Sequence, residues 1–309
     1  MKTFIRVAEV WVPSAEGGLL ELGGGLFDAA PAFGAISRTM CFGRGEGLPG
    51  RAWEEGRPLL LHRLEGSYFR RVTAARAAGL SCAVALPIFI GERLTSVVVL
   101  LCGDSDTHVG AIELWRNDPR IESDLRLADG YFGSTDPSLE DLTRDGSLSR
   151  GTGLPGLAWQ REASVFIDNI GASRHFLRAQ TAARAGIVRG LAIPCSTRMH
   201  QTWVLSLLSS QRTPIARRIE SWLPDDSGRR LQRAFAFCES AGSLPACAAS
   251  STPVEASIAI NRAWTTSVAQ VAHGSTSSAT EPPDAGSRPL LALPVIGDDV
   301  VSEVIALYF

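Results

Sequence analysis

The sequence lacks most features that would bind nucleic acid, cross a membrane or hold a structural metal. Its 309 residues carry a net charge of −2, so no basic field is present to attract nucleic acid. The longest apolar run, at 96–102, has the length of a buried strand, and the N-terminus alternates apolar and polar residues where a signal peptide would be apolar. The six cysteines form no Cys-x-x-Cys pair, and the five histidines do not cluster with them. We therefore expect a cytoplasmic protein that has no metal centre and binds neither nucleic acid nor membranes.

One nine-residue phrase occurs twice in the chain. GEGLPGRAW occupies 45–53 and GTGLPGLAW occupies 151–159, an offset of 106 residues. Further matches follow at an offset of 107, among them Phe69 with Phe176. A single one-residue shift over such a length is a strong repeat signal, and a period this long suits whole domains better than a solenoid.

A shorter pattern, Glu-x-Trp, occurs three times and would open each of three units. Its copies lie at 9–11, 113–115 and 220–222. In the third unit, 243–248 resembles a worn opening phrase and 256–261 resembles 163–168 of the second unit, whereas 273–287 reads as a polar insertion. We predict three domains of usual size, at 1–105, 106–212 and 213–309, of which the third is a degenerate copy.

Each unit is expected to be an α+β domain on an antiparallel sheet. In the first strand Val7, Glu9 and Trp11 would face one way and the residues between them the other way, because strand side chains alternate. Pro49 is placed to begin a short helix with Trp53 as its anchor in the core. A second helix is predicted over 67–78, followed by a hairpin at 82–102; the third unit would use Trp264, Val268 and Val271 in its second helix.

The repeated phrase and the hairpin that starts at Leu86-Pro87-Ile88 resemble the GAF domain, and also the GAF-like region of plant NIN-like regulators. The resemblance covers 5–103 and 108–210 well and 215–309 weakly. It implies three consecutive GAF-like domains, each a central antiparallel sheet flanked by helices. It also implies a small-ligand sensor or a dimerisation module, since GAF domains hold cyclic nucleotides, bilins, haem, nitrate or nothing between the sheet and one face of helices and loops. No particular cofactor follows from it.

The candidate ligand-binding residues lie on or beside the second helix of units one and two. They are Phe69, Arg70, Arg71, Cys82, Asp168, His175, Phe176 and Arg178. The arginines could face an anionic ligand, or they could lie on the solvated face of an amphipathic helix. Instead of binding a ligand, Asp168 could stabilise a turn or cap a helix, and His175 could be an ordinary surface histidine.

The sequence predicts a protein that is not an enzyme and has no catalytic residues. We expect a sensory or regulatory protein in signalling that binds a small ligand, associates as a homodimer or with a regulatory partner protein, or does both. One alternative is a ligand-free structural or dimerisation module. The other is the enzyme of this fold, free methionine-(R)-sulfoxide reductase, which needs a nucleophilic thiolate with resolving cysteines nearby. Leu48-Pro49 occupies the place of one of its signature cysteines, and 62–74 contains no cysteine.

Overall fold

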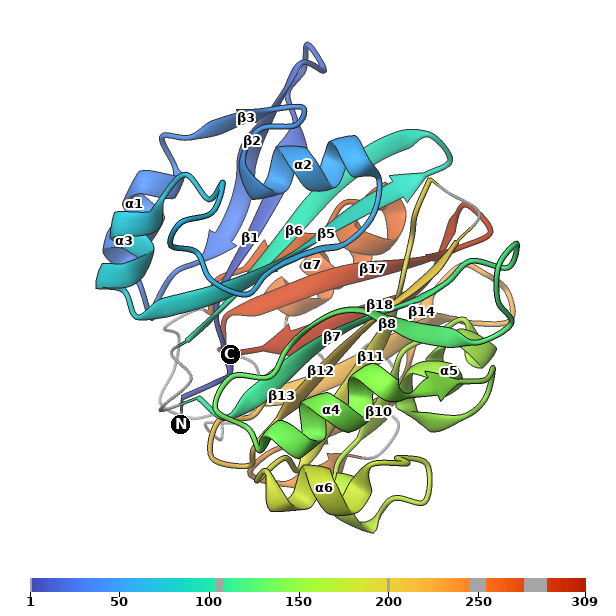
Figure 1. The fold of residues 1–309 in the computed structure, drawn as a ribbon. Coiled ribbons are helices and arrows are strands. Elements are labelled where there is room, and N and C mark those ends of the chain that lie inside the picture. Colours follow the sequence, from blue (N-terminus) through green and yellow to red (C-terminus); the bar gives the residue numbers. More distant parts are fainter. Residues whose placement is uncertain (1, 104–107, 199–200, 245–253, 275–287) are drawn as a thin grey trace.

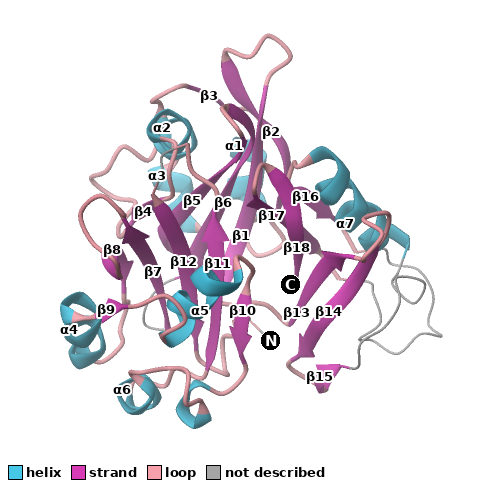
Figure 2. Ribbon diagram, turned by 90° about the vertical axis from the view of Figure 1, so that its right-hand side faces the viewer, coloured by secondary structure: helices cyan, strands magenta, loops and turns pink. Residues whose placement is uncertain are grey.

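The computed structural model describes residues 2–103, 108–198, 201–244, 254–274 and 288–309. Its strands form three antiparallel sheets of six strands each. The strand order is the same in all three, 3-2-1-6-5-4 when the strands are counted within each sheet, so the first and last strands pair in the centre (Figures 1 and 2). The expected α+β class, with three consecutive antiparallel sheets flanked by helices, is confirmed.

We call each sheet with its helices a unit. Unit 1 consists of β1 (Ile5–Pro13), β2 (Leu19–Leu26), α1 (Pro31–Ser37), β3 (Cys41–Gly43), α2 (Gly47–Glu55), β4 (Leu59–Leu61), α3 (Val72–Ala77), β5 (Leu80–Ile90) and β6 (Arg93–Gly103). Unit 2 consists of β7 (Gly110–Asn117), β8 (Leu125–Tyr131), α4 (Pro137–Asp145), β9 (Ser147–Leu148), α5 (Gly153–Arg161), β10 (Val165–Ile167), a 3-10 turn (Ile170–Ala172), α6 (Ala179–Arg184), β11 (Arg189–Cys195) and β12 (Thr202–Ser209). Unit 3 consists of β13 (Arg218–Pro224), β14 (Leu231–Cys238), β15 (Gly242–Leu244), α7 (Val254–Thr266), β16 (Gln270–Ala272), β17 (Leu290–Gly297) and β18 (Val300–Tyr308).

The repeated glycine phrase forms a tight turn that leads into α2 and, in unit 2, into α5. Gly45 and Gly47 have φ of 80° and 57°, where side chains other than glycine are strained. Gly50 is needed for a different reason, because a Cβ there would lie 2.0 Å from the carbonyl oxygen of Gly43. The second copy repeats these features at Gly151, Gly153 and Gly156. The expectation that Trp53 is the core anchor is wrong: Trp53 is only partly buried, and Leu48 and Ala52 carry the buried face.

The predicted second helix is shorter than expected. Only 72–77 is helical in unit 1, because the residues before it form a turn in which the Ser67 hydroxyl accepts a hydrogen bond from the Phe69 N–H at 3.1 Å. In unit 3 the expected correspondence of 256–261 to 163–168, the segment that contains β10, is wrong. Those residues lie in α7, where Ala256, Ala259, Ile260 and Ala263 are buried at helical spacing.

The position of α7 corrects the alignment of unit 3. It directly precedes β16, as α2 precedes β4 and α5 precedes β10, so α7 corresponds to the first helix of the other units. Trp264 therefore lies on that helix, whereas Val268 follows it and Val271 lies on β16. The expected worn phrase begins in β15, but its residues 245–248 and most of the polar insertion, 275–287, lie outside the described residues.

Both faces of each sheet carry mainly buried apolar side chains, and the predicted alternation of the first strand is confirmed. On β1, Val7 and Trp11 face the helices of unit 1, whereas Ala8 and Val10 belong to a cluster built from strands of all three units. Each unit therefore has its own core on the outer, helix-covered face, and the three inner faces share a central core (Figure 1).

The three units close into a ring around this central core. The equivalent strands β5, β11 and β17 contact one another. At the sheet edges β4 contacts β8 and β16 contacts β2. The third edge is formed by Phe166 on β10, whose ring centroid lies 6.2 Å from that of Phe235 and 5.1 Å from that of Phe237 on β14. Each unit thus presents the same edge to the next, which is the head-to-tail arrangement of a closed cyclic assembly within one chain.

Hydrogen bonds at equivalent positions join the units. The Ala269 N–H donates to the Ser96 hydroxyl at 3.2 Å, and the Ser164 N–H donates to the Glu303 carboxylate at 2.6 Å. Ser96 and Glu303 hold the same place in β6 and β18, next to the residues that pair with Trp11 and Trp222. At the third junction the Arg57 guanidinium lies over the Trp203 ring at 5.3 Å.

Among the described residues, no helix is long and apolar enough to cross a membrane.

Replacing Gly50 or Gly156 with alanine should lower the free energy of unfolding by about 2 kcal/mol or more, because each Cβ would overlap a backbone oxygen that cannot move away cheaply. Gly18→Ala is the matched control, since nothing lies within 4 Å of its Cβ position and its φ is not in the left-handed region. Urea denaturation followed by circular dichroism measures the three variants. Equal stability of all three would contradict the structural role assigned to the phrase.

Candidate functional site

A buried ion pair lies under the helices of unit 1. Glu9 on β1 is fully buried, and its Oε2 accepts hydrogen bonds from Arg71 Nη2 at 2.9 Å and from the Trp11 indole N–H at 3.1 Å. Arg71 Nη1 donates to the other oxygen of Glu9 and, at 2.5 Å, to the Ser37 hydroxyl. The strand alternation that buries Trp11 also buries Glu9, so the carboxylate requires a partner inside the core.

Unit 2 repeats this arrangement residue by residue. Arg178 Nη1 lies 2.7 Å from Glu113 Oε1, and the Trp115 indole N–H donates to Glu113 at 2.8 Å. Arg178 also donates to the hydroxyl of Thr143, which occupies the place of Ser37. The Glu-x-Trp pattern and the two arginines were both visible in the sequence, but their pairing was not, because 62 and 65 residues separate the partners.

Unit 3 neutralises its buried carboxylate with residues from strands. Glu220 accepts hydrogen bonds from Arg233 Nη1 at 2.9 Å and from Trp222 at 3.0 Å, and it is paired with Arg218. The Tyr308 hydroxyl donates to it at 2.9 Å. Burial, followed by the nearby Glu220 carboxylate, raises the pKa of Tyr308 well above its usual value.

Aromatic rings enclose the Arg71 guanidinium. Its central carbon lies 4.6 Å from the ring centroid of Phe33, 5.2 Å from that of Phe69 and 5.4 Å from that of Trp11. Arg71 thus lies between the sheet and the helices of unit 1, paired with Glu9 and surrounded by aromatic rings. Arg178 occupies the same position in unit 2, over Phe176 at 4.9 Å.

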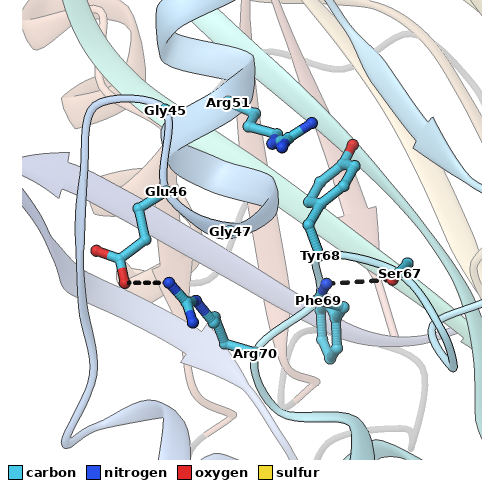
Figure 3. Close-up of a pocket in the computed structure, with 8 residues that line it drawn as sticks. All are labelled: Gly45, Glu46, Gly47, Arg51, Ser67, Tyr68, Phe69 and Arg70. Carbon is cyan, nitrogen blue, oxygen red and sulfur yellow. Dashed lines mark hydrogen bonds and ion pairs between the residues drawn. The ribbon is translucent and has the colours of Figure 1, made fainter.

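A pocket of about 480 Å³ lies on the outer side of unit 1, and we call it the unit-1 pocket (Figure 3). Its walls are the glycine turn at 45–47, one turn of α2 and the segment 67–70. Its lining side chains are those of Glu46, Arg51, Ser67, Tyr68, Phe69 and Arg70.

Charged and aromatic groups fix the shape of the unit-1 pocket. The Arg51 guanidinium carbon lies 4.0 Å from the centroid of the Tyr68 ring, which is a close cation–π contact. Arg70 Nη2 lies 3.1 Å from Glu46 Oε1, and the other oxygen of Glu46 accepts from the Gly43 N–H (Figure 3). Burial raises the pKa of Tyr68, and the Arg51 charge partly opposes this, so its hydroxyl stays protonated at neutral pH.

The predicted ligand-binding residues fall into three groups. Phe69 and Arg70 line the unit-1 pocket. Arg71 and Arg178 belong to the buried ion pairs, with Phe69 and Phe176 packed against them.

The third group, Cys82, Asp168 and His175, is not part of either arrangement. Cys82 is buried in the central core, opposite Cys102 on the next strand. Asp168 is exposed and its backbone carbonyl accepts from Arg189, whereas His175 is exposed on the loop before α6.

Sequence reasoning did not select Glu46, Arg51 or Tyr68. The comparison of the two repeats could have identified these residues, because they differ in an otherwise similar segment: the aligned positions of unit 2 carry Thr152, Leu157 and His175. The expectation of no metal site stays a prediction; within the described residues no three of the His, Cys, Asp and Glu side chains are grouped so that they could hold a metal ion.

Replacing Arg71 with leucine should lower the free energy of unfolding by about 3–5 kcal/mol, because Glu9 would be left buried without its counter-charge. Arg70→Leu is the matched control, since Arg70 is its exposed neighbour, and its effect should stay within about 0.5 kcal/mol. Chemical denaturation at neutral pH measures both. Equal destabilisation by the two variants would show that the Glu9–Arg71 pair does not support the fold.

Comparisons with known proteins place the chain by fold. No known protein family matches the sequence, and no curated protein does. Among solved structures, the chain is similar to the GAF domain of nlh2 from A. aeolicus in an inactive state, with 19% identity over 32% of this chain and 58% of that one (TM-score 0.26). It is also similar to the GAF domain of the phosphoenolpyruvate-protein phosphotransferase from Acinetobacter, with 21% identity over 34% of this chain and 55% of that one (TM-score 0.24).

A third similar structure is an enzyme. It is the free methionine-R-sulfoxide reductase from Neisseria meningitidis in complex with its substrate, with 16% identity over 34% of this chain and 53% of that one (TM-score 0.25). In all three comparisons this chain spans between 53% and 58% of the other chain's length. Several of the solved structures to which the chain is similar are thus GAF domains, and each match covers about a third of the chain, as one of its three units does.

Proposed function

We propose that this chain is a non-catalytic sensory or regulatory protein that binds a small ligand in the unit-1 pocket and passes the signal to a partner protein. The observation that supports this most strongly is the pocket itself. Its volume of about 480 Å³ is in the range of small-molecule sites, and charged side chains of α2 and of the segment 67–70 line it. We further propose that the three units correspond to domains at 1–105, 106–212 and 213–309, and that the protein acts in the cytoplasm.

Thiol chemistry is the competing enzymatic hypothesis, and the surroundings of the cysteines that the structure describes argue against it. A nucleophilic thiolate needs access and a lowered pKa. Cys82 and Cys102 are both fully buried, and burial raises the pKa of Cys102 well above its usual value. Burial also raises the pKa of Cys195 to about 12. Cys41 is exposed, but it lies on the edge strand β3, away from both buried thiols.

A ligand-free structural module is the second candidate, and two observations favour it. The interiors of units 1 and 2 are filled by their own Arg71 and Arg178. The inner faces of all three sheets are covered within the ring, so a second copy of the chain would have to associate through outer surfaces. The unit-1 pocket argues against this candidate, because a ligand-free module has no need of such a pocket.

Native mass spectrometry of protein purified from its own host tests the proposal. We expect a bound small molecule on the wild-type protein that is lost from an Arg51→Leu/Arg70→Leu variant, because both side chains line the pocket. An Arg174→Leu/Arg184→Leu variant removes the same charge from exposed positions of unit 2 and should keep the molecule. A wild-type protein that carries no small molecule when purified, and that binds none when candidates are added, supports the structural module instead.

Cysteine reactivity tests the thiol hypothesis separately. Among the described cysteines, iodoacetamide at pH 8 should modify Cys41 in the folded protein well before Cys82, Cys102 or Cys195, because burial keeps the other thiols protonated or inaccessible. Peptide mass spectrometry locates the modified residues, and labelling in denaturant is the control. Turnover of free methionine sulfoxide that disappears in a Cys82→Ser variant would overturn the non-catalytic assignment.

A further inference from the structure

The duplication within the chain provides a comparison for the unit-1 pocket. The glycine turns of units 1 and 2 have the same backbone: the Gly45 N–H donates to the Gly50 carbonyl at 2.8 Å, and the Gly151 N–H donates to the Gly156 carbonyl at 2.8 Å. The helices that follow also match, since α2 and α5 each have nine residues. Any difference in side chains at this place is therefore a difference in chemistry on a shared scaffold.

Unit 2 does not share the two arginines of the pocket. Where unit 1 has Arg51 and Arg70, the aligned positions of unit 2 have Leu157 and Leu177. Leu177 is 64% exposed, so this position is not part of a core in unit 2, and the arginine in unit 1 is not required for packing. The cation–π pair of Arg51 with Tyr68 has no counterpart either, because Tyr68 aligns with His175.

The side chains that line the pocket carry two guanidinium groups and one carboxylate, that of Glu46, which is paired with Arg70. Two further carboxylates lie nearby, because Glu54 is beside Gly45 and Glu55 is close enough to raise the pKa of Tyr68. The side chains of the Arg70–Glu46 pair are 57% and 41% exposed, and such surface pairs are weak and exchange readily. Arg51 is held in place by the Tyr68 ring, so its donors are oriented before a ligand arrives.

We propose that the unit-1 pocket recognises a small ligand through an anionic group, a phosphate or a carboxylate, bound between Arg51 and Arg70. Guanidinium groups match the paired oxygens of both anions and form strong charge-assisted hydrogen bonds with them. The incoming anion takes the place of the Glu46 carboxylate at Arg70, so Glu46 acts as an internal competitor. The inference rests on the proposed function, because it names the ligand class for the same pocket.

Isothermal titration calorimetry at constant ionic strength tests the inference, with inorganic phosphate as one probe and citrate as the other. We expect at least one of them to bind to the wild-type chain, and the affinity to fall about tenfold or more in Arg51→Leu/Arg70→Leu. This variant should fold, because Arg51 and Arg70 are both exposed and neither belongs to the core of unit 1. Its melting temperature checks that point, and Arg174→Leu/Arg184→Leu, with the same loss of charge, should bind as the wild type does.

Glu46→Gln provides an independent readout in the opposite direction. Its amide oxygen can still accept from the Gly43 N–H, but the competing charge is gone, so the affinity for the anion should rise about threefold or more. If Glu46 had only a structural role, the Glu46→Gln substitution would not raise the affinity for the anion.

The possible outcomes separate the two proposals. Anion binding that is unchanged in the Arg51→Leu/Arg70→Leu variant overturns the inference, because the site then lies elsewhere. A pocket that retains an uncharged molecule from the host and binds neither probe also overturns the inference, but it leaves the proposed function intact. A pocket that binds neither a probe nor a host molecule overturns both.

Discussion

Each sheet in this protein is apolar on both faces, while the helices of its own unit cover only one of them. The inner face must therefore be covered by something else, and the chain meets this requirement by placing three such faces against one another. The energetic reason is the hydrophobic effect, which at about 25 cal/mol per Å² makes a bare sheet face very unfavourable. The ring, its order and its contacts follow from this constraint. Because one core is shared by all three units, each unit depends on the other two to bury the inner face of its sheet.

The same strand alternation creates the second constraint, the buried Glu of each Glu-x-Trp pattern. A strand that places Trp11, Trp115 or Trp222 in the outer core also places there the Glu two residues before it, because residues i and i+2 share a face. Units 1 and 2 compensate the charge with an arginine that directly precedes α3 or α6, which ties that segment to the sheet. Unit 3 uses Arg218, Arg233 and Tyr308 from strands of its own sheet. Two solutions of one electrostatic problem thus coexist in a single chain, because a buried carboxylate tolerates any well-placed donors but not their absence.

These two constraints explain where the units are free to differ. The inner faces and the buried ion pairs carry the fold, so they keep their character from unit to unit. The surroundings of the glycine turn differ between the units: Arg51, Tyr68 and Arg70 of unit 1 align with Leu157, His175 and Leu177 of unit 2. Leu157 joins the core of unit 2, whereas His175 and Leu177 are exposed there. Divergence at exposed loops on a constant scaffold is where ligand-binding residues are usually found.

The sequence by itself determined the number of units, their class and the local geometry of the repeated phrase. These depend on short-range rules: the alternation of Val7, Glu9 and Trp11 along a strand, and the positive φ that only glycine adopts without strain at Gly45 and Gly47. The tertiary structure alone decided that Arg71 belongs to Glu9, that Arg70 beside it lines a pocket, and that Trp53 lies at the margin of the core. It also decided that α7 is the counterpart of α2 and α5, and that the second faces of the sheets close on one another. The reason is the same in each case: these outcomes depend on which residues, 60 or more positions apart, share a volume from which water is excluded, and no local pattern encodes that choice.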